Sequence, residues 1–102
     1  QSLYTTWDES FVPAQEAYPG KYITYVRRHD KEWFIGSMTI EARNMTVSLD
    51  FLEKGKTYTA YIYSSDDEGE LIVNEKNISS DDTLAIPLKE LDGVAVYISE
   101  NN

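Results

Sequence analysis

The single histidine is the first candidate for chemistry, because a Ser-His-Asp triad in this chain would have to use it. That histidine, His29, follows an alternating segment and precedes a short polar stretch typical of a hairpin turn. We interpret it as a solvated turn residue. With one histidine and no cysteine, the chain also lacks the His and Cys ligands of a typical zinc site. The motifs of P-loop, dinucleotide-binding, α/β-hydrolase and zinc-protease sites do not occur.

Acidic residues are the second candidates, since a glycosidase needs two carboxyl groups about 5–10 Å apart beside a sugar-sized cleft. Neighbouring acids occur at Asp8-Glu9, Asp66-Asp67-Glu68 and Asp81-Asp82. These lie in a predicted arm and in predicted loops of a domain too small for a deep cleft. Residues 66–70 also lack the ligand spacing of an EF-hand. We therefore interpret these groups as solvated and expect that this fragment is not an enzyme.

Aromatic residues are the third candidates, because sugar-binding modules often place Trp or Tyr rings flat against a sugar. The residues suited to such a platform are Trp33, Tyr61 and Tyr63, together with Tyr22 and Tyr25. Packing is the competing explanation. Alternation places Trp33 with Ile35 on one strand face and Phe34 with Met38 on the other, so both faces carry large apolar groups. A sheet that is apolar on both faces usually has a second surface to cover. We favour packing and keep carbohydrate binding as the alternative.

These residues need elements to position them, and the pattern along the chain is strand, turn, strand. Alternating or β-branched segments predict about seven short strands, at residues 22–29, 33–40, 44–49, 57–63, 71–73, 83–88 and 94–98. No segment shows a sustained helical period. Short turns between consecutive strands favour antiparallel pairing, so the expected fold is all-β, a two-layer antiparallel β-sandwich. Gly36 suggests a bulge or a close backbone approach, and Pro87 suggests an edge strand or the end of its strand.

The first part of the chain differs from the rest. Residues 1–20 look irregular yet contain the large apolar residues Trp7 and Phe11. We interpret residues 1–20 as a linker or arm and residues 21–102 as the sandwich domain. Trp7 and Phe11, with Tyr25, are then the candidates for an interface with a neighbour. Because the chain starts at Gln1 without a signal-like segment, we expect it to be a piece of a longer polypeptide.

The charge balance bears on possible partners. Nine basic and eighteen acidic residues give a formal net charge of −9 in 102 residues. Such a surface repels phosphate backbones and anionic membranes, so neither nucleic acid nor a membrane is an expected partner. No apolar run approaches the roughly 18 residues that span a bilayer. The simplest interpretation of the net charge is that it keeps the protein soluble.

Several segments, taken in order, resemble one known family. They are Trp7-Asp8-Glu9-Ser10, Pro19-Gly20-Lys21-Tyr22, Arg27-Arg28, Trp33-Phe34-Ile35-Gly36-Ser37-Met38-Thr39, Leu49-Asp50-Phe51-Leu52 and Tyr58-Thr59-Ala60-Tyr61-Ile62-Tyr63. This pattern resembles the C-terminal domain of glycoside hydrolase family 97 over nearly the whole chain. It departs from the family near the end, where Gly93-Val94 lacks a second glycine.

The resemblance implies a bacterial α-glucosidase or α-galactosidase built from an N-terminal β-rich domain, a catalytic (β/α)8 barrel and this C-terminal sandwich. Residues 1–20 would be the connection leaving the barrel. The catalytic carboxylates and a calcium ion would belong to the barrel, so no catalytic residue or cofactor is carried over to this fragment. The implied partners are the barrel of the same polypeptide and another subunit. The implied location is the periplasm or the outside of a bacterial cell.

Overall fold

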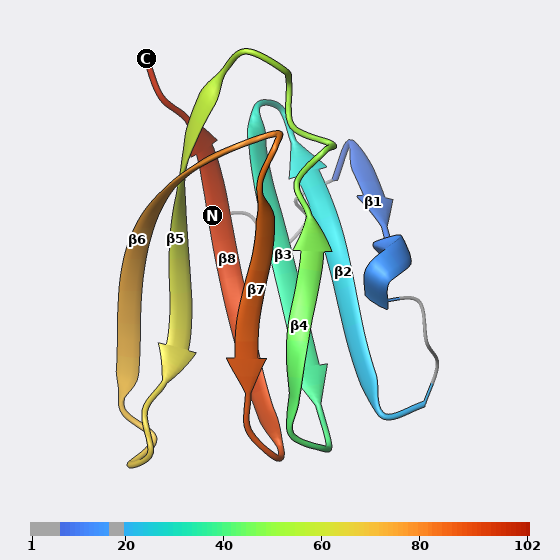
Figure 1. The fold of residues 1–102 in the computed structure, drawn as a ribbon, viewed down its shortest axis with the longest axis vertical. Helices are drawn as coiled ribbons and strands as arrows, with labels where there is room; N and C mark the ends of the chain where they lie inside the picture. The colour runs from blue at the N-terminus through green and yellow to red at the C-terminus, as the bar shows by residue number, and fades with distance from the viewer. Residues whose placement is uncertain (1–6, 17–19) are drawn as a thin grey trace.

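The computed structural model describes residues 7–16 and 20–102 of the chain. Over these residues the chain forms eight strands and one short 3-10 helix (Figure 1). In chain order the elements are β1 (Glu9–Phe11), η1 (Ala14–Glu16), β2 (Tyr22–His29), β3 (Glu32–Thr39), β4 (Arg43–Ser48), β5 (Thr57–Ser65), β6 (Leu71–Ser79), β7 (Thr83–Leu88) and β8 (Asp92–Glu100). No helix among the described residues is long and apolar enough to cross a membrane.

The strands form two antiparallel sheets of unequal size. Six strands follow the order β1-β2-β3-β8-β5-β6, and β4 pairs with β7 in a separate two-stranded sheet. In Figure 1 the small sheet lies in front of β3 and β8, while β5 and β6 extend to one side. The expected all-β, two-layer antiparallel sandwich is confirmed, with one strand more than expected.

The extra strand comes from the segment that the sequence predicts to be an irregular arm. Glu9–Phe11 pairs with β2, so that Phe11 lies opposite Val26, and it forms one edge of the large sheet. Three residues are too short to display an alternating pattern, and Pro13 follows closely. Part of the expected arm therefore belongs to the sandwich. Residues 1–6 and 17–19 of that arm lie outside the described residues.

The core lies between the two sheets, because every second residue of each covered strand points into it. Its fully buried side chains come from both layers and include Val26, Ile35, Met45, Val47, Leu49, Leu84, Val96 and Ile98. At one end of this core the ring of Trp33 lies 4.5 Å from that of Phe51, and Phe11 packs edge-on against both. The aromatic cluster thus joins β1 and β3 to the loop after β4.

Strand β6 is longer than the expected residues 71–73. It continues through the polar residues 74–77, and Asn74 and Asn77 still lie opposite Ile62 and Thr59 of β5. Since β6 is the outer edge of the large sheet, most of its residues are exposed on both faces. Backbone pairing with β5 holds such a strand without an apolar face, so its sequence gives little sign of where it ends.

Gly36 and Pro87 have structural roles close to those expected. Gly36 stays in register opposite Tyr25, without a bulge. A Cβ added to Gly36 would lie 2.6 Å from Cζ and Oη of Tyr25, so the close approach is made by the Tyr25 ring over the Gly36 backbone. Pro87 lies in β7, and each strand of a two-stranded sheet has one open edge that tolerates a missing N–H.

Candidate functional site

The acidic pairs considered as catalytic groups are used in turns and ion pairs. The Asp66 carboxylate accepts hydrogen bonds from the amides of Glu68 and Glu70, both at 2.9 Å. Lys89 donates to Asp67 at 2.8 Å, and this contact lowers the pKa of the Asp67 carboxyl. Asp82 accepts the amide of Ser79 at 2.8 Å. These carboxylates shape loops, which is a role that needs no substrate.

The acids at the start of the chain also have structural partners. Asp8 accepts the amide of Asp30 at 2.6 Å, and Asp8 and Glu9 lie 3.5 and 3.3 Å from the Arg28 guanidinium. These contacts hold β1 to the β2–β3 turn, where His29 is exposed. In residues 7–16 and 20–102 no group of three or more His, Cys, Asp or Glu side chains is placed to hold a metal ion.

Among the described residues, Glu16 is the buried carboxylate, and no pattern in the sequence predicts its burial. Arg43 donates to its two oxygens at 2.5 and 2.7 Å, while the Thr24 hydroxyl and the Thr46 amide donate at 2.7 and 3.0 Å. Burial alone would raise the pKa of Glu16, but the hydrogen bonds from Arg43, Thr46 and Thr24 outweigh it and lower the pKa. Glu16 thus ties η1 to both sheets as a structural anchor.

The other face of the large sheet, the one turned away from β4 and β7, carries a group of aromatic and apolar side chains. We call it the aromatic face and define it by Ile23, Tyr25, Arg27, Phe34, Met38, Tyr61, Tyr63, Ala95 and Tyr97, together with Trp7. The strand residues of this face alternate with core positions, as pairing in register requires. Trp7 precedes β1 and stacks on Phe34 with ring centres 6.1 Å apart.

Apart from the stacked pair of Trp7 and Phe34, the paired rings of the aromatic face meet at interplanar angles of 40° to 87°. Phe34 lies 4.9 Å from Tyr97 and 5.9 Å from Tyr25, at interplanar angles of 55° and 40°. Tyr63 meets Tyr97 edge-on at 87°. The Arg27 guanidinium lies 4.3 Å from the Tyr25 ring centre and 5.8 Å from that of Trp7. This is an interlocked cluster and not a row of coplanar rings of the kind that stacks on a sugar.

The residues singled out from the sequence fall on different faces. Trp7 and Tyr25 lie on the aromatic face, whereas Phe11 is half-buried against the core on the opposite side. Tyr61 and Tyr63 also belong to the aromatic face, but Trp33 is 8% exposed and packs in the core. Trp33 therefore cannot share one surface with the two tyrosines. Sequence reasoning did not list Phe34, Met38 or Tyr97 as site residues, although the alternation that it noted for Phe34 and Met38 was the available signal.

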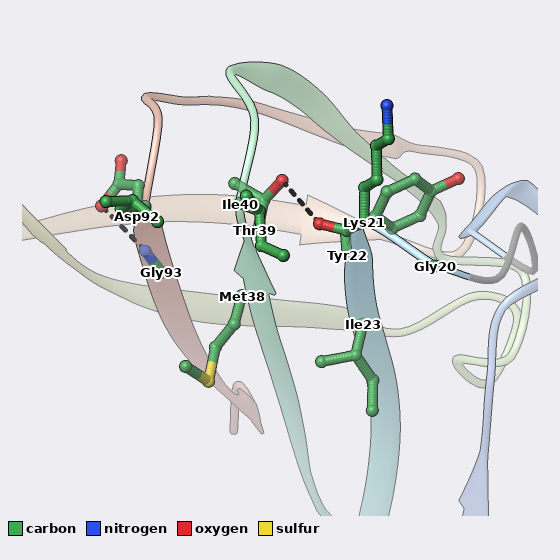
Figure 2. A pocket seen from close by; sticks show the side chains of 10 residues that line it. Gly20, Lys21, Tyr22, Ile23, Met38, Thr39, Ile40, Asp92 and Gly93 are labelled. Atoms are coloured by element: carbon green, nitrogen blue, oxygen red, sulfur yellow. Dashed lines mark hydrogen bonds between the residues drawn. The ribbon is translucent and has the colours of Figure 1, made fainter.

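An apolar groove adjoins the aromatic face where β2 begins and β3 ends. Its volume is about 460 Å³, and its lining includes Tyr22, Ile23, Met38, Ile40, Leu91 and Gly93. In Figure 2 the side chains of Ile23 and Met38 extend toward the same side of the sheet. We call this feature the Leu91 groove. It shares Ile23 and Met38 with the aromatic face, so the two features form one continuous apolar surface.

Comparison with known proteins connects this geometry to a family. Residues 6–99 match the model of a family described as glycosyl-hydrolase 97 C-terminal, oligomerisation. A search of curated protein sequences finds no match.

Solved structures support the same assignment. A glycoside hydrolase family 97 enzyme from Pseudoalteromonas, in complex with acarbose, is 25% identical over 94% of this chain, with a TM-score of 0.80. Its complex with panose gives 24% identity and a TM-score of 0.82. A beta-arabinopyranosidase is 22% identical over 89% of the chain, with a TM-score of 0.72. The chain spans only 14–16% of the length of these proteins.

Two independent observations therefore agree. Asp8, Glu9, Asp66, Asp67 and Asp82 are used in turns and ion pairs, while the aromatic face exposes large apolar side chains. The family model over nearly all of the sequence describes an oligomerisation domain. The chain belongs to the family of glycosyl-hydrolase 97 C-terminal oligomerisation domains.

Proposed function

We propose that this chain is the C-terminal, non-catalytic domain of a larger glycoside hydrolase of the bacterial α-glucosidase or α-galactosidase type. Family membership supports this proposal, as does the small share of the solved relatives that the chain spans. The catalytic carboxylates and a calcium ion would then belong to a catalytic barrel elsewhere in the polypeptide. The enzyme would act in the periplasm or outside the cell.

The role of the domain in that enzyme is to stabilise the catalytic part and support its assembly. The observation that carries this role is the uncovered aromatic face, on which Ile23, Met38 and Tyr97 are each more than half exposed. Contiguous apolar patches of more than a few hundred Å² are uncommon on monomeric proteins and mark contacts with another surface. When this face packs against the catalytic part, the apolar surface of both domains is removed from water.

Deletion of residues 1–102 from the full polypeptide tests this function. We expect the truncated enzyme to unfold at a lower temperature or to have a different number of subunits, as measured by light scattering. Its relative kcat/KM for two glycoside substrates should stay within about twofold of the full enzyme, because no group that touches substrate is removed. An unchanged unfolding temperature and an unchanged number of subunits, combined with altered substrate preference, would contradict the proposal.

Carbohydrate binding remains a second candidate, because Tyr25, Tyr61 and Tyr63 all lie on the aromatic face. Electrophoresis of the chain through gels containing starch or galactan separates the two functions. We expect no retardation, since the rings interlock at steep angles. A retarded band that Tyr63→Ala abolishes would favour carbohydrate binding instead.

A further inference from the structure

Open strand edges are a second kind of surface in this fold, besides the aromatic face. In the part of the chain that the structure describes, the two sheets end in four such edges, at β1, β6, β4 and β7. An open edge presents backbone N–H and C=O groups to which a strand of another molecule can add. We propose that the edge of β4 is a strand-pairing site that the side chains of Gln15 and Glu16 hold closed against a second copy of the chain. The closure concerns the strands of this chain and does not depend on the proposed function.

Three of the four edges have features of their own that hinder pairing. Strand β1 has only three residues. Strand β6 carries Glu75 and Lys76, and both are exposed. Strand β7 contains Pro87, which has no N–H group. Very short edge strands, charged side chains and proline each discourage the addition of a further strand. Among these four edges, β4 is therefore the one that needs protection from another part of the chain.

The sequence of β4 is suited to pairing. From Asn44 to Leu49 it contains neither a charged residue nor a proline, and Arg43, the charged residue of the strand, is paired with Glu16. Uncharged segments of about six residues with high β-propensity are those that pair most readily between molecules. An antiparallel copy centred on Thr46 would continue the small sheet without interruption. An uncovered β4 edge would therefore be a site of self-association.

The direction of two amides identifies the open side of β4. The Thr46 amide donates to Oε2 of Glu16 at 3.0 Å, and the Ser48 amide donates to Oε1 of Gln15 at 3.4 Å. Both amides therefore face away from β7, as alternate residues of an antiparallel strand do. In Figure 1, η1 lies on the β4 side of the small sheet, away from β7. Two side chains of η1 thus supply the acceptors that a neighbouring strand would supply.

The Glu16 side chain is held in this position from both sheets. Its buried carboxylate accepts hydrogen bonds from Arg43 of β4 at 2.5 and 2.7 Å and from the Thr24 hydroxyl of β2 at 2.7 Å. A second strand could reach the Thr46 amide only by displacing η1 and separating Glu16 from Arg43. Breaking a buried ion pair opposes that displacement. The closure is therefore fixed by the fold and does not depend on a freely rotating side chain.

Amide hydrogen exchange in the wild-type chain tests whether the closure is in place. Thr46 and Ala85 lie directly opposite each other in the small sheet, and the backbone groups of each point to an open edge. The Thr46 edge is covered by η1, whereas Ala85 is exposed. We expect the Thr46 amide to exchange on the order of 100-fold more slowly than the Ala85 amide after correction for intrinsic rates. Equal rates would overturn the proposal.

Sedimentation equilibrium of variants tests what the closure prevents. The double variant Glu16→Ala, Arg43→Ala removes both partners of the ion pair, so that no buried charge is left unpaired. We expect its self-association constant to exceed that of the wild-type chain by at least about tenfold, because a second copy supplies the acceptor that the Thr46 amide has lost. Adding Asn44→Pro removes an N–H group from the same edge and leaves Gln15 in place. This third substitution should restore the wild-type association constant.

Ile98→Ala is the matched control, because it destabilises the core without uncovering an edge. Its association constant should equal that of the wild type. The proposal fails if the double variant, folded by circular dichroism, associates no more than the wild type, if Ile98→Ala associates as strongly, or if Asn44→Pro has no effect. If the double variant does not fold, Gln15→Ala replaces it. That variant uncovers the Ser48 amide alone and should raise the association constant about threefold, and no increase would overturn the proposal.

Discussion

The two faces of the six-stranded sheet carry similar apolar residues, but one face is buried and the other is exposed. On β8, Ile98 points to the face covered by β4 and β7 and is buried, whereas its neighbour Tyr97 points to the aromatic face and is half exposed. In the part of the chain that the structure describes, two strands lie outside the large sheet, and these can cover only one of its faces. Apolar alternation therefore does not distinguish a core from an interface. The difference is set by where a second layer is available.

Polar groups differ between the faces as well. On the covered face, Thr24, Ser37, Glu16 and Arg43 form a connected network, with 2.7 Å between the Thr24 and Ser37 hydroxyl oxygens. No buried side-chain nitrogen or oxygen in the described part of the chain lacks a hydrogen-bond partner. On the aromatic face, Arg27 lies over rings. The covered face is complete within the chain, while the aromatic face still has room for a partner.

The largest effect is expected from breaking the buried network of the covered face. Glu16→Ala leaves Arg43 without its carboxylate and the Thr46 amide without its acceptor. Loss of one partner of a buried ion pair costs about 3–5 kcal/mol. Urea unfolding of the chain measures this loss.

The control is Glu41→Ala, which removes the exposed pair with Lys21 and should change the free energy of unfolding by less than about 1 kcal/mol. Equal losses in the two variants would show that the Glu16 network contributes no more than a surface pair.

The second prediction compares the loss of stability caused by alanine substitutions at two adjacent residues of β8. Ile98→Ala opens a cavity in the core and should cost about 3 kcal/mol. Tyr97→Ala removes only ring contacts with Phe34 and Tyr63 at the surface, so in the chain by itself it should cost about 1 kcal/mol. Thermal unfolding of both variants measures the two losses of stability and therefore their ratio. A larger loss from Tyr97→Ala would mean that the aromatic face already acts as a core.

A smaller effect concerns the fit of Tyr25 over Gly36. Gly36→Ala places a Cβ against the Tyr25 ring, which must move, at a cost of about 1 kcal/mol. In a Tyr25→Ala background the same change should be neutral or slightly stabilising, because the obstacle is gone. A double-mutant cycle measured by urea unfolding gives the coupling. Additive changes in the free energy of unfolding would show that the Tyr25 ring moves aside without a loss of stability.

The smallest effect concerns pH. Glu16 has a pKa below its ordinary value of 4.5, so it contributes stability above about that pH. The contribution is lost as pH falls through the lower pKa of the folded state. We expect the stability difference between the wild type and Glu16→Gln to be constant from neutral pH down to about pH 5 and to shrink below pH 4.5. Urea unfolding at several pH values checks this, and a difference that persists at the lowest pH would contradict it.

Much of the fold was predictable, because local patterns report local geometry. Alternation placed Trp33 with Ile35 on one face and Phe34 with Met38 on the other, and the observed register confirms both assignments. The edge position expected for Pro87 is also confirmed, and so is the family. Strand β1 and the extension of β6 were missed, because one is very short and the other is polar on both faces.

The sequence by itself determined that the strands form, which residues share a face and which family the chain belongs to, since steric preference and period-two alternation act between close neighbours. Only the tertiary structure decided which face is the core and which stays open. It also decided the role of Glu16, whose partners Thr24, Arg43 and Thr46 lie 8, 27 and 30 residues away. Contacts at such separations depend on how the layers stack, and no local pattern records that arrangement.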